Sequence, residues 1–354
     1  MEFKALSHPT LIGSFPGKDH RKAVDQVFKY CPEVPCWPQL PAYPQEGMLR
    51  QFTTGLPGFS SENLVLDSTS PEFEAEMLAF YEEYMAIQEG AQRLSESRFV
   101  IQREEAPGLY LLVEEIQKKA IKPKAVKGQI TGPFTLATGI KTPDDRAVFY
   151  DLQLRDLITK LAALKGAWQA EFLAQTGVPV IVFFDEPALA GFGSSAFVGV
   201  SEEDILQVLS EVANEIRAKG ALPGTHVCAN TEWRLLVEAG VSVISFDAFD
   251  YLDRFLLFTA DLKKFLEQGG IIAWGIVPTL KPEALEKATS SELTERLKKA
   301  VDELSQKTDI PLKQIVLQSL ITPSCGMGTL PENLAEQALR LTREVADQLR
   351  EDYL

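Results

Sequence analysis

The sequence predicts an α/β fold in which buried parallel strands alternate with amphipathic helices. Eight short apolar runs, most of them rich in β-branched or aromatic residues, lack the polar alternation of half-exposed strands. A length of 354 residues suits either two domains or a single α/β barrel. Together these observations predict a TIM (β/α)8 barrel that forms one domain over residues 1–354, with an irregular N-terminal cap before about residue 100.

The predicted strands are residues 10–15, 99–102, 125–130, 180–184, 222–227, 241–246, 271–276 and 315–320. Residues 147–175 place Leu and aromatic side chains at helical spacing, and Gly177 follows as a stop signal. Ser201 and Asp204 form a capping-box pattern at the start of the next helix, and Pro331 opens the last one. An open doubly wound sheet is the main alternative, but no Gly-x-Gly-x-x-Gly follows an early strand.

The composition limits the classes of partner. Lys and Arg number 35 against 50 Asp and Glu, which gives a formal charge of −15. This charge argues against nucleic acid or an anionic membrane as the main partner. The first residues lead into no apolar signal core, and no run of about 18 apolar residues occurs. Four Cys are too few for a disulfide framework, so we expect a soluble, cytoplasmic protein.

Polar residues collect where the predicted strands end, which is the end of a barrel that carries the active site. These segments are Ile-Gly-Ser-Phe-Pro at 12–16, Gly-Gln-Ile-Thr-Gly-Pro at 128–133, Asp-Glu-Pro at 185–187, Thr-His-Val-Cys at 225–228, Ser-Phe-Asp at 245–247 and Thr-Pro-Ser-Cys-Gly at 322–326. His226 and Cys228 are two apart on a predicted strand, so their side chains leave the same face.

A metal site is one interpretation of this pair, although a lone His-x-Cys is more often core packing. The chain has only three His and four Cys, and Asp247 and Cys325 end other predicted strands. Together His226, Cys228, Asp247 and Cys325 form a tetrahedral zinc set from three segments. The close Cys-x-x-Cys pairs of structural zinc sites are absent from the sequence, which favours a catalytic zinc.

The ligand types indicate a reaction class. A zinc ion that carries two thiolates and a carboxylate is electron-rich, and it acidifies water poorly compared with an all-His site. Such an ion suits a substrate thiol held as the nucleophilic thiolate. His226, Cys228 and Cys325 are therefore the predicted catalytic residues.

The same segments resemble the C-terminal catalytic barrel of cobalamin-independent methionine synthase, within the uroporphyrinogen-decarboxylase-like superfamily. The matching stretches are Ile-Gly-Ser-Phe-Pro at 12–16, Val-Lys-Gly-Gln-Ile-Thr-Gly-Pro at 126–133, Asp-Glu-Pro-Ala-Leu at 185–189, His-Val-Cys at 226–228, Val-Ile-Ser-Phe-Asp at 243–247 and Pro-Ser-Cys-Gly at 323–326. The resemblance covers nearly the whole chain in order. The family's separate N-terminal half has no counterpart, so the chain resembles a core-only form.

The resemblance implies roles for individual residues. The positions that match zinc ligands are His226, Cys228, Cys325 and, where the family has Glu, Asp247. The segment that holds homocysteine through its carboxylate and backbone corresponds to Ile12, Gly13 and Ser14. Asp185 matches the acid that takes the homocysteine ammonium group, and Glu46 is the candidate for a further acid, from the cap, that contacts this amine.

The methyl donor is predicted from the departures. Gly139 and Gly191 stand where the family has a folate-contacting Trp and a Glu, and its Arg-Cys folate contact has no counterpart. The family's His that protonates the folate nitrogen is also missing after the seventh predicted strand. A methyl group that leaves nitrogen needs that proton, whereas a Co(I) corrinoid leaves without one. We therefore expect a methyl-corrinoid donor, presented by a separate corrinoid protein, to methylate homocysteine to methionine.

Other functions stay open at this point. Methyltetrahydrofolate is the alternative donor, and coenzyme M or another thiol is the alternative acceptor. A metal-free uroporphyrinogen-decarboxylase-like enzyme and a non-enzymatic corrinoid or thiol carrier are further alternatives. Cys31 and Cys36 lie in a Pro-rich stretch with no second pair to complete a metal site, so we expect them to pack in the core.

Overall fold

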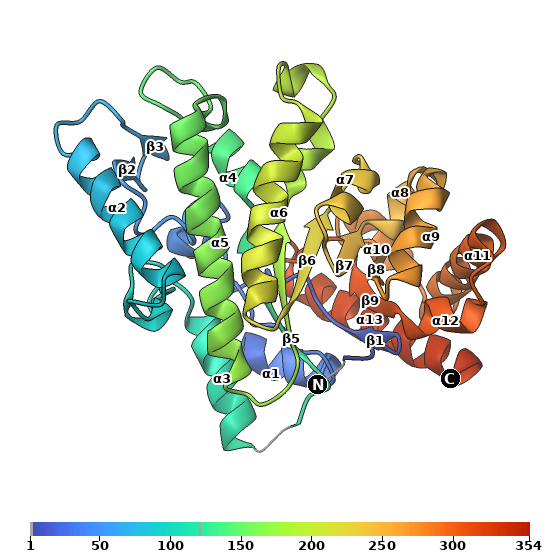
Figure 1. The fold of residues 1–354 in the computed structure, drawn as a ribbon. Helices are drawn as coiled ribbons and strands as arrows, with labels where there is room; N and C mark the ends of the chain where they lie inside the picture. The colour runs from blue at the N-terminus through green and yellow to red at the C-terminus, as the bar shows by residue number, and fades with distance from the viewer. Residues whose placement is uncertain (1–2, 120–121) are drawn as a thin grey trace.

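Seven strands form one curled parallel sheet in the computed structural model, which describes residues 3–119 and 122–354 (Figure 1). The sheet order is β1–β9–β8–β7–β6–β5–β4. Its strands are β1 (His8–Pro9), β4 (Val126–Thr131), β5 (Val180–Asp185), β6 (Leu222–Val227), β7 (Val243–Phe246), β8 (Ile271–Val277) and β9 (Ser319–Pro323). A short hairpin, β2 (Phe59–Ser60) and β3 (Val65–Leu66), stands apart from the sheet. The predicted α/β class is confirmed, and the curled parallel sheet is consistent with a TIM-like fold.

Helices cover the outside of the sheet (Figure 1). The α-helices of the described residues are α1 (His20–Tyr30), α2 (Phe73–Gln88), which lies away from the sheet, α3 (Pro107–Lys118), α4 (Pro133–Gly139), α5 (Leu152–Ala174), α6 (Glu202–Ala218), α7 (Trp233–Glu238), α8 (Ala248–Phe255), α9 (Thr259–Glu267), α10 (Pro282–Lys287), α11 (Ser290–Thr308), α12 (Leu312–Leu317) and α13 (Glu332–Tyr353). The predicted capping box of α6 is confirmed, since Ser201 and Asp204 exchange both hydrogen bonds. No helix of the described residues is long and apolar enough to cross a membrane.

The sequence places the central strands well and the outer ones poorly. Strands β4 to β8 begin and end within two residues of their predictions. The predicted strand at 315–320 is wrong in its first half, because residues 315–317 end helix α12 and the strand starts at Ser319. The predicted strand at 10–15 is also displaced, since β1 is only His8–Pro9. Residues 99–102 form no strand, although Phe99 and Ile101 are fully buried.

Residues 35–39 lie between β4 and the continuation of β1, although they form only single bridges. Cys36 bridges to Lys127 on β4, and Gln39 bridges to Ser14 after β1, both in parallel orientation. The Lys127 amide donates to the Pro35 carbonyl oxygen at 2.9 Å, and the Gln39 amide donates to the Gly13 carbonyl oxygen at 2.9 Å. This Pro-rich segment therefore occupies the gap between the two outer strands of the sheet.

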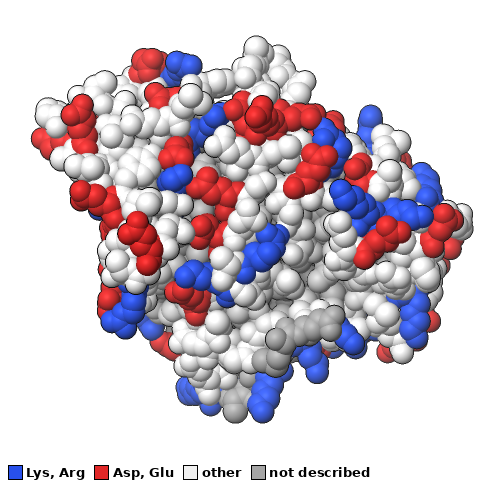
Figure 2. Space-filling model, viewed as in Figure 1, with Lys and Arg blue, Asp and Glu red and all other residues white. Residues whose placement is uncertain are grey.

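Two apolar clusters fill the molecule. A small cluster lies among the strands and includes Ile181, Phe183, Val243 and Leu320, whereas a much larger one packs the helices against the sheet. Continuous apolar runs in the strands follow from burial on both faces. Figure 2 shows Asp and Glu side chains interleaved with Lys and Arg over one face of the molecule.

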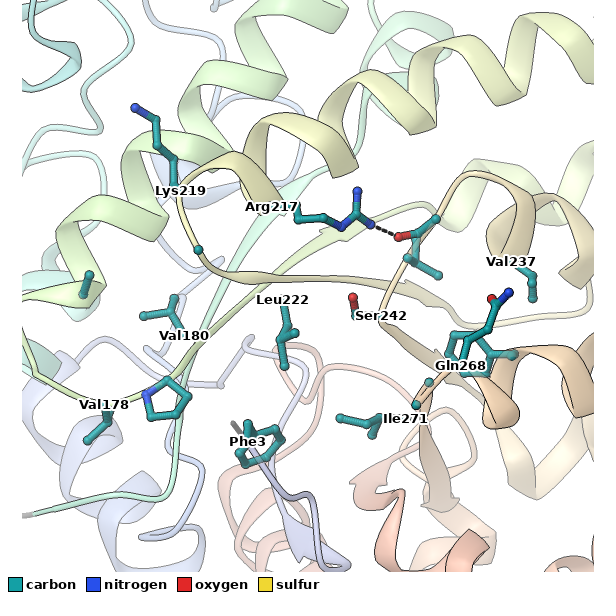
Figure 3. Close-up of a pocket in the computed structure, with 18 residues that line it drawn as sticks. Phe3, Val178, Val180, Arg217, Lys219, Leu222, Val237, Ser242, Gln268 and Ile271 are labelled. Carbon is teal, nitrogen blue, oxygen red and sulfur yellow. Dashed lines mark hydrogen bonds between the residues drawn. The ribbon is translucent and has the colours of Figure 1, made fainter. Parts of the chain in front are cut away.

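A cavity of about 680 Å³ opens at the amino ends of the strands (Figure 3). Val180, Leu222 and Ile271, which begin β5, β6 and β8, point into it together with Phe3. Among the described residues that line it there is no His, Cys, Asp or Glu. Catalytic groups of barrel enzymes gather at the opposite ends of the strands, so this cavity is not the candidate active site.

Candidate active site

A second cavity, of about 340 Å³, lies at the carboxyl ends of the strands. Its walls come from the ends of β4, β5 and β6, from the segments after β1 and β9, and from residues 39–52. The lining residues that the sequence singled out are Ile12, Ser14, Glu46, Gln129, Thr131, Asp185, His226, Cys228 and Cys325. The fold thus brings residues more than 300 positions apart into one pocket at the carboxyl ends of the parallel strands.

Three of the predicted metal ligands form a compact group. One potential ligand atom each of His226, Cys228 and Cys325 lies within 4.8 Å of the other two. His226 is nearly fully buried and the two thiols are partly buried. A nitrogen and two sulfur donors at this spacing are the ligand types that zinc prefers, and three protein ligands leave a fourth position open.

The ring of His226 is oriented for such a role. Its Nδ1 lies 2.9 Å from the hydroxyl oxygen of Ser245 on the neighbouring strand β7. Its Nε2 is buried without any hydrogen-bond partner. A buried ring nitrogen without a partner is costly, and a metal ion bound to that nitrogen would remove the cost while the Ser245 contact fixes the ring.

The two thiols are unequal. Their mutual hydrogen bond and the nearby His226 lower the pKa of Cys228 well below the usual range for a thiol. The same contact with Cys228 raises the pKa of Cys325, and burial raises it further. Cys228 is therefore the thiol that ionises first, and the group is prepared to bind a cation as a thiolate.

The backbone of Cys325 is held by Thr279, a residue that the sequence analysis did not single out. The Thr279 hydroxyl donates to the Cys325 carbonyl oxygen at 2.9 Å and accepts from the Cys325 amide at 3.0 Å. The Thr279 amide also donates to the Ser324 hydroxyl oxygen at 3.1 Å. These bonds fix the loop after β9 and so fix the direction of the Cys325 side chain.

Asp247, the predicted fourth ligand, is not part of the group. Its carboxylate caps helix α8 and accepts a hydrogen bond from the Asp250 amide at 3.0 Å. The physical reason is that a strand-end acid followed at once by a helix is also in the ideal position for an N-cap. Burial raises the pKa of Asp247 to about 6, against the amide of Asp250.

Asp185 presents an unsatisfied carboxylate to the cavity. It ends β5 and is buried, and its Oδ1 has no hydrogen-bond partner. Burial raises the pKa of Asp185 above its usual range, while Lys127 and His226 oppose that shift. A buried acid without a partner predicts a cationic ligand group, because an ammonium would supply both charge and hydrogen bonds.

Glu46 reaches the same cavity from the N-terminal region. Its Oε1 lies 2.6 Å from Nε2 of His20, and its Oε2 accepts from the Leu40 amide at 2.8 Å. Burial raises the pKa of Glu46, and the contacts with Leu40 and His20 lower it. The His20 ring stacks on Tyr43, so the histidine that contacts this acid is itself held in place.

The segment after β1 forms part of the cavity wall. Ile12 and Ser14 line the cavity, and Gly13 has a φ of +147°, a conformation that favours glycine. A Cβ at Gly13 would lie 2.5 Å from Nε2 of Gln129 and 2.9 Å from Oε1 of Gln39. Glycine at this position lets the backbone approach both amides.

Replacing Gly13 with alanine is expected to lower the free energy of unfolding by about 1–3 kcal/mol, because backbone strain and steric overlap add. Urea unfolding measures the change. The matched control is Gly177→Ala, where φ is +74° but no atom lies within 4 Å of the added Cβ. Equal losses in the two variants would show that the close approach of Gly13 to Gln129 contributes nothing.

Three further lining residues belong to the N-terminal region that the sequence predicted as a cap. Gln39, Met48 and Phe52 come from a Pro-rich stretch without a motif. The partner of His226 is Ser245, which lies opposite His226 in the β6–β7 register. Cys31 and Cys36 are fully buried free thiols in the large apolar cluster, and burial raises the pKa of both; they lie where packing was expected.

Residues 87–348 match the family model described as the catalytic domain of cobalamin-independent synthase. No curated protein sequence matches the chain significantly. One similar solved structure is that of a B12-independent methionine synthase from a Shewanella species in complex with selenomethionine. It is 16% identical with a TM-score of 0.46, over 68% of this chain and 66% of that one, so the chain spans about two thirds of its length.

The family match corrects the predicted methyl donor. A cobalamin-independent synthase does not take its methyl group from a corrinoid, so the expected methyl-corrinoid and the expected corrinoid protein partner are both wrong. The absence of a folate-type acid and of folate contacts was too indirect to identify a donor. With nearly three quarters of its length matched, the chain belongs to the family of cobalamin-independent synthase catalytic domains.

Proposed function

We propose that the chain is a zinc-dependent methyltransferase that transfers a methyl group from methyltetrahydrofolate to the thiol of homocysteine and forms methionine. The observation that supports this most is one cavity that combines two thiols and an imidazole within 4.8 Å with the unpartnered carboxylate of Asp185. A soft metal site suits a thiol, and a buried acid beside it suits an ammonium group.

The residues present fit a zinc ion. His226 offers a buried nitrogen without a partner, and Cys228 has a lowered pKa that favours the thiolate a metal requires. His226, Cys228 and Cys325 would hold the ion. When bound, zinc stabilises the substrate thiol as a thiolate, which is its nucleophilic form.

The remaining lining residues would bind the amino-acid part of homocysteine. Asp185 and Glu46 would face its ammonium group, and the backbone around Ile12 and Ser14 would hold its carboxylate. Burial makes each of these polar contacts stronger than it would be in water. Because the cavity is small, about 340 Å³, these contacts also fix the direction of the thiol.

The folate donor is the alternative that the sequence analysis kept. The substrate sulfur forms a bond to the methyl carbon as the bond from that carbon to the folate nitrogen breaks; the nitrogen takes up a proton and the thiol loses one. A Cβ at Gly139 would lie 2.7 Å from Leu49, and one at Gly191 would lie 2.7 Å from Phe197. Neither position has room for a larger side chain. Contacts with the folate would therefore come from other residues of the cavity wall.

The same proposal includes a closed eight-stranded barrel that acts as one catalytic domain over the whole chain. Residues 35–39 would take the eighth place, supported by the bridges of Cys36 to Lys127 and of Gln39 to Ser14. The residues before about 100 would act as the cap, since Glu46, Met48 and Phe52 line the cavity. Closure would hold β4 and the segment after β1, which both line the cavity, in register with each other.

The test is direct. Purified protein is analysed for zinc per chain and then mixed with L-homocysteine and radiolabelled methyltetrahydrofolate, as the monoglutamate and as the triglutamate, and labelled methionine is measured. Label in methionine that depends on zinc supports the proposal. Coenzyme M in place of homocysteine is the acceptor control. A zinc-loaded protein that methylates coenzyme M but not homocysteine would overturn the proposed acceptor.

Asp247→Asn is expected to keep one zinc per chain, because the Asp247 carboxylate caps α8 outside the three-residue group. Asparagine is also a good N-cap, so the variant removes the charge without removing the helix cap. Elemental analysis after dialysis measures the metal. Loss of zinc from this variant would instead identify Asp247 as the fourth ligand that the sequence predicted.

A further inference from the structure

Lys127 is a fully buried lysine in the interior of the sheet that the proposed chemistry does not use. It lies on β4, and none of its surface is exposed. No carboxylate oxygen of the described residues lies within 4 Å of its Nζ. Lysine is almost never fully buried without a charged partner, so the contacts that its ammonium group makes need an explanation.

The ammonium group of Lys127 makes two hydrogen bonds just below the cavity. Nζ donates to the Ile12 carbonyl oxygen at 2.8 Å and to Oε1 of Gln129 at 3.2 Å. It also lies over the Phe183 ring, 4.4 Å from the centroid. The Ile12 carbonyl belongs to the segment proposed to hold the substrate carboxylate, so the lysine fixes the backbone of that segment from beneath.

Gln129 extends the contact to the other side of the wall. Its Nε2 donates to the Trp37 carbonyl oxygen at 2.8 Å and to Oε1 of Gln39 at 3.1 Å. Lys127 and Gln129 are two apart on β4 and therefore face the same side of the sheet. Through these bonds the Lys127 ammonium group links β4 to the segment after β1 and, by way of Gln129, to residues 37–39.

The charge of Lys127 also acts on Asp185. Each of the two lies in the other's field, and the attraction of Lys127 lowers the pKa of Asp185 against the effect of burial. Burial acts in the other direction on both groups, lowering the pKa of Lys127 and raising that of Asp185. A cation in that place favours the ionised carboxylate that an ammonium ligand requires.

We propose that Lys127 is a positioning residue for the amino-acid group of the substrate, holding the Ile12 backbone and Gln129 in place. The inference rests on the proposed function, because it takes homocysteine as the ligand. It assigns Lys127 no contact with the thiol and no part in metal binding. Its loss should therefore affect recognition of the amino acid and leave the sulfur chemistry alone.

The test is the Lys127→Met variant, which keeps the length of the side chain and removes its charge. We expect zinc per chain to be unchanged and KM for homocysteine to rise about 10- to 100-fold, the range for a lost hydrogen bond to a charged group, with a smaller change in kcat. Propanethiol, which lacks the ammonium and carboxylate groups, should be methylated by the variant as well as by the wild type.

The matched control is Lys165→Met. Lys165 is also fully buried, but it lies on α5 and points to the Val100 carbonyl oxygen, 3.4 Å away and outside the cavity. Both variants lose a buried charge, so both change the free energy of unfolding. Only Lys127→Met should change KM for homocysteine. Equal KM values in the two variants would overturn the proposal and leave Lys127 a structural residue.

A second variant keeps the inference testable if Lys127→Met does not fold. Gln129→Met removes the link from Lys127 to residues 37–39 while the lysine stays in place, and it should raise KM for homocysteine without loss of zinc. An unchanged KM in a folded Gln129→Met would also contradict the proposal. If wild-type protein methylates propanethiol but does not bind homocysteine, the proposed function fails first, and this outcome is distinct from either variant's result.

Discussion

Cys325→Ser is expected to lose bound zinc and methyl transfer together. The hydroxyl of serine stays protonated at neutral pH and is a poor ligand for zinc compared with a thiolate. Two ligands, His226 and Cys228, would remain of the group within 4.8 Å. We expect activity to fall by at least about 10³-fold, because the stabilisation of the substrate thiolate by the metal is worth several kcal/mol.

Zinc per chain and methionine formation are measured on the same preparation. Cys31→Ser is the matched control, since Cys31 is a buried free thiol in the apolar core and does not line the cavity. That variant should lose some stability and keep its zinc. Full zinc and full turnover in Cys325→Ser would show that the three-residue group is not the metal site.

The sequence predicted the middle of the sheet because burial on both faces leaves a simple pattern. Strands β5 and β8 are continuous apolar runs, and the polar residues that follow them mark the active end. His226, Cys228 and Cys325 could be found because rare residue types recurred at several strand ends. A group of ligands from separated segments is visible once the strand ends are known.

The edges of the sheet could not be predicted for the opposite reason. Residues 35–39 contain Pro35 and Pro38, which cannot donate to a ladder, so they are typical of a loop. Their bridges to β4 and to the segment after β1 depend on partners far away in the chain. Phe99 and Ile101, by contrast, belong to an apolar run that is typical of a strand, but they are buried in irregular backbone.

Supporting residues were missed because their roles depend on geometry alone. Thr279 and Ser245 are small hydroxyl residues of a common type, and only the fold places them against Cys325 and His226. Asp247 was predicted from its position at a strand end, but that position is also the start of α8. A helix N-cap and a metal ligand require the same kind of residue in the same place.

Asp185→Asn is expected to raise KM for homocysteine about 30- to 4,000-fold, because removing one partner of a buried charged pair costs about 2–5 kcal/mol. Zinc should stay at one per chain, since Asp185 is outside the ligand group. Steady-state kinetics at several concentrations of homocysteine separate KM from kcat. An unchanged KM would show that the ammonium group binds elsewhere.

The same variant should not lose stability, and this separates a binding residue from a structural one. Burial raises the folded-state pKa of Asp185 above its unfolded value, so the wild type loses stability as the pH rises through the folded pKa. Asparagine does not ionise, so Asp185→Asn should be at least as stable as the wild type at pH values above that pKa.

Glu115→Gln is the control, because this variant is expected to lose stability and to keep its KM. Glu115 is a buried acid on α3 that pairs with Arg21 and Lys119, and these partners lower its pKa. Its replacement should lower the free energy of unfolding and leave KM unchanged. A carboxylate kept in the fold without a partner, at a cost in stability, is the pattern of a site built for a ligand. Parallel losses of stability in both variants would mean that Asp185 serves the fold instead.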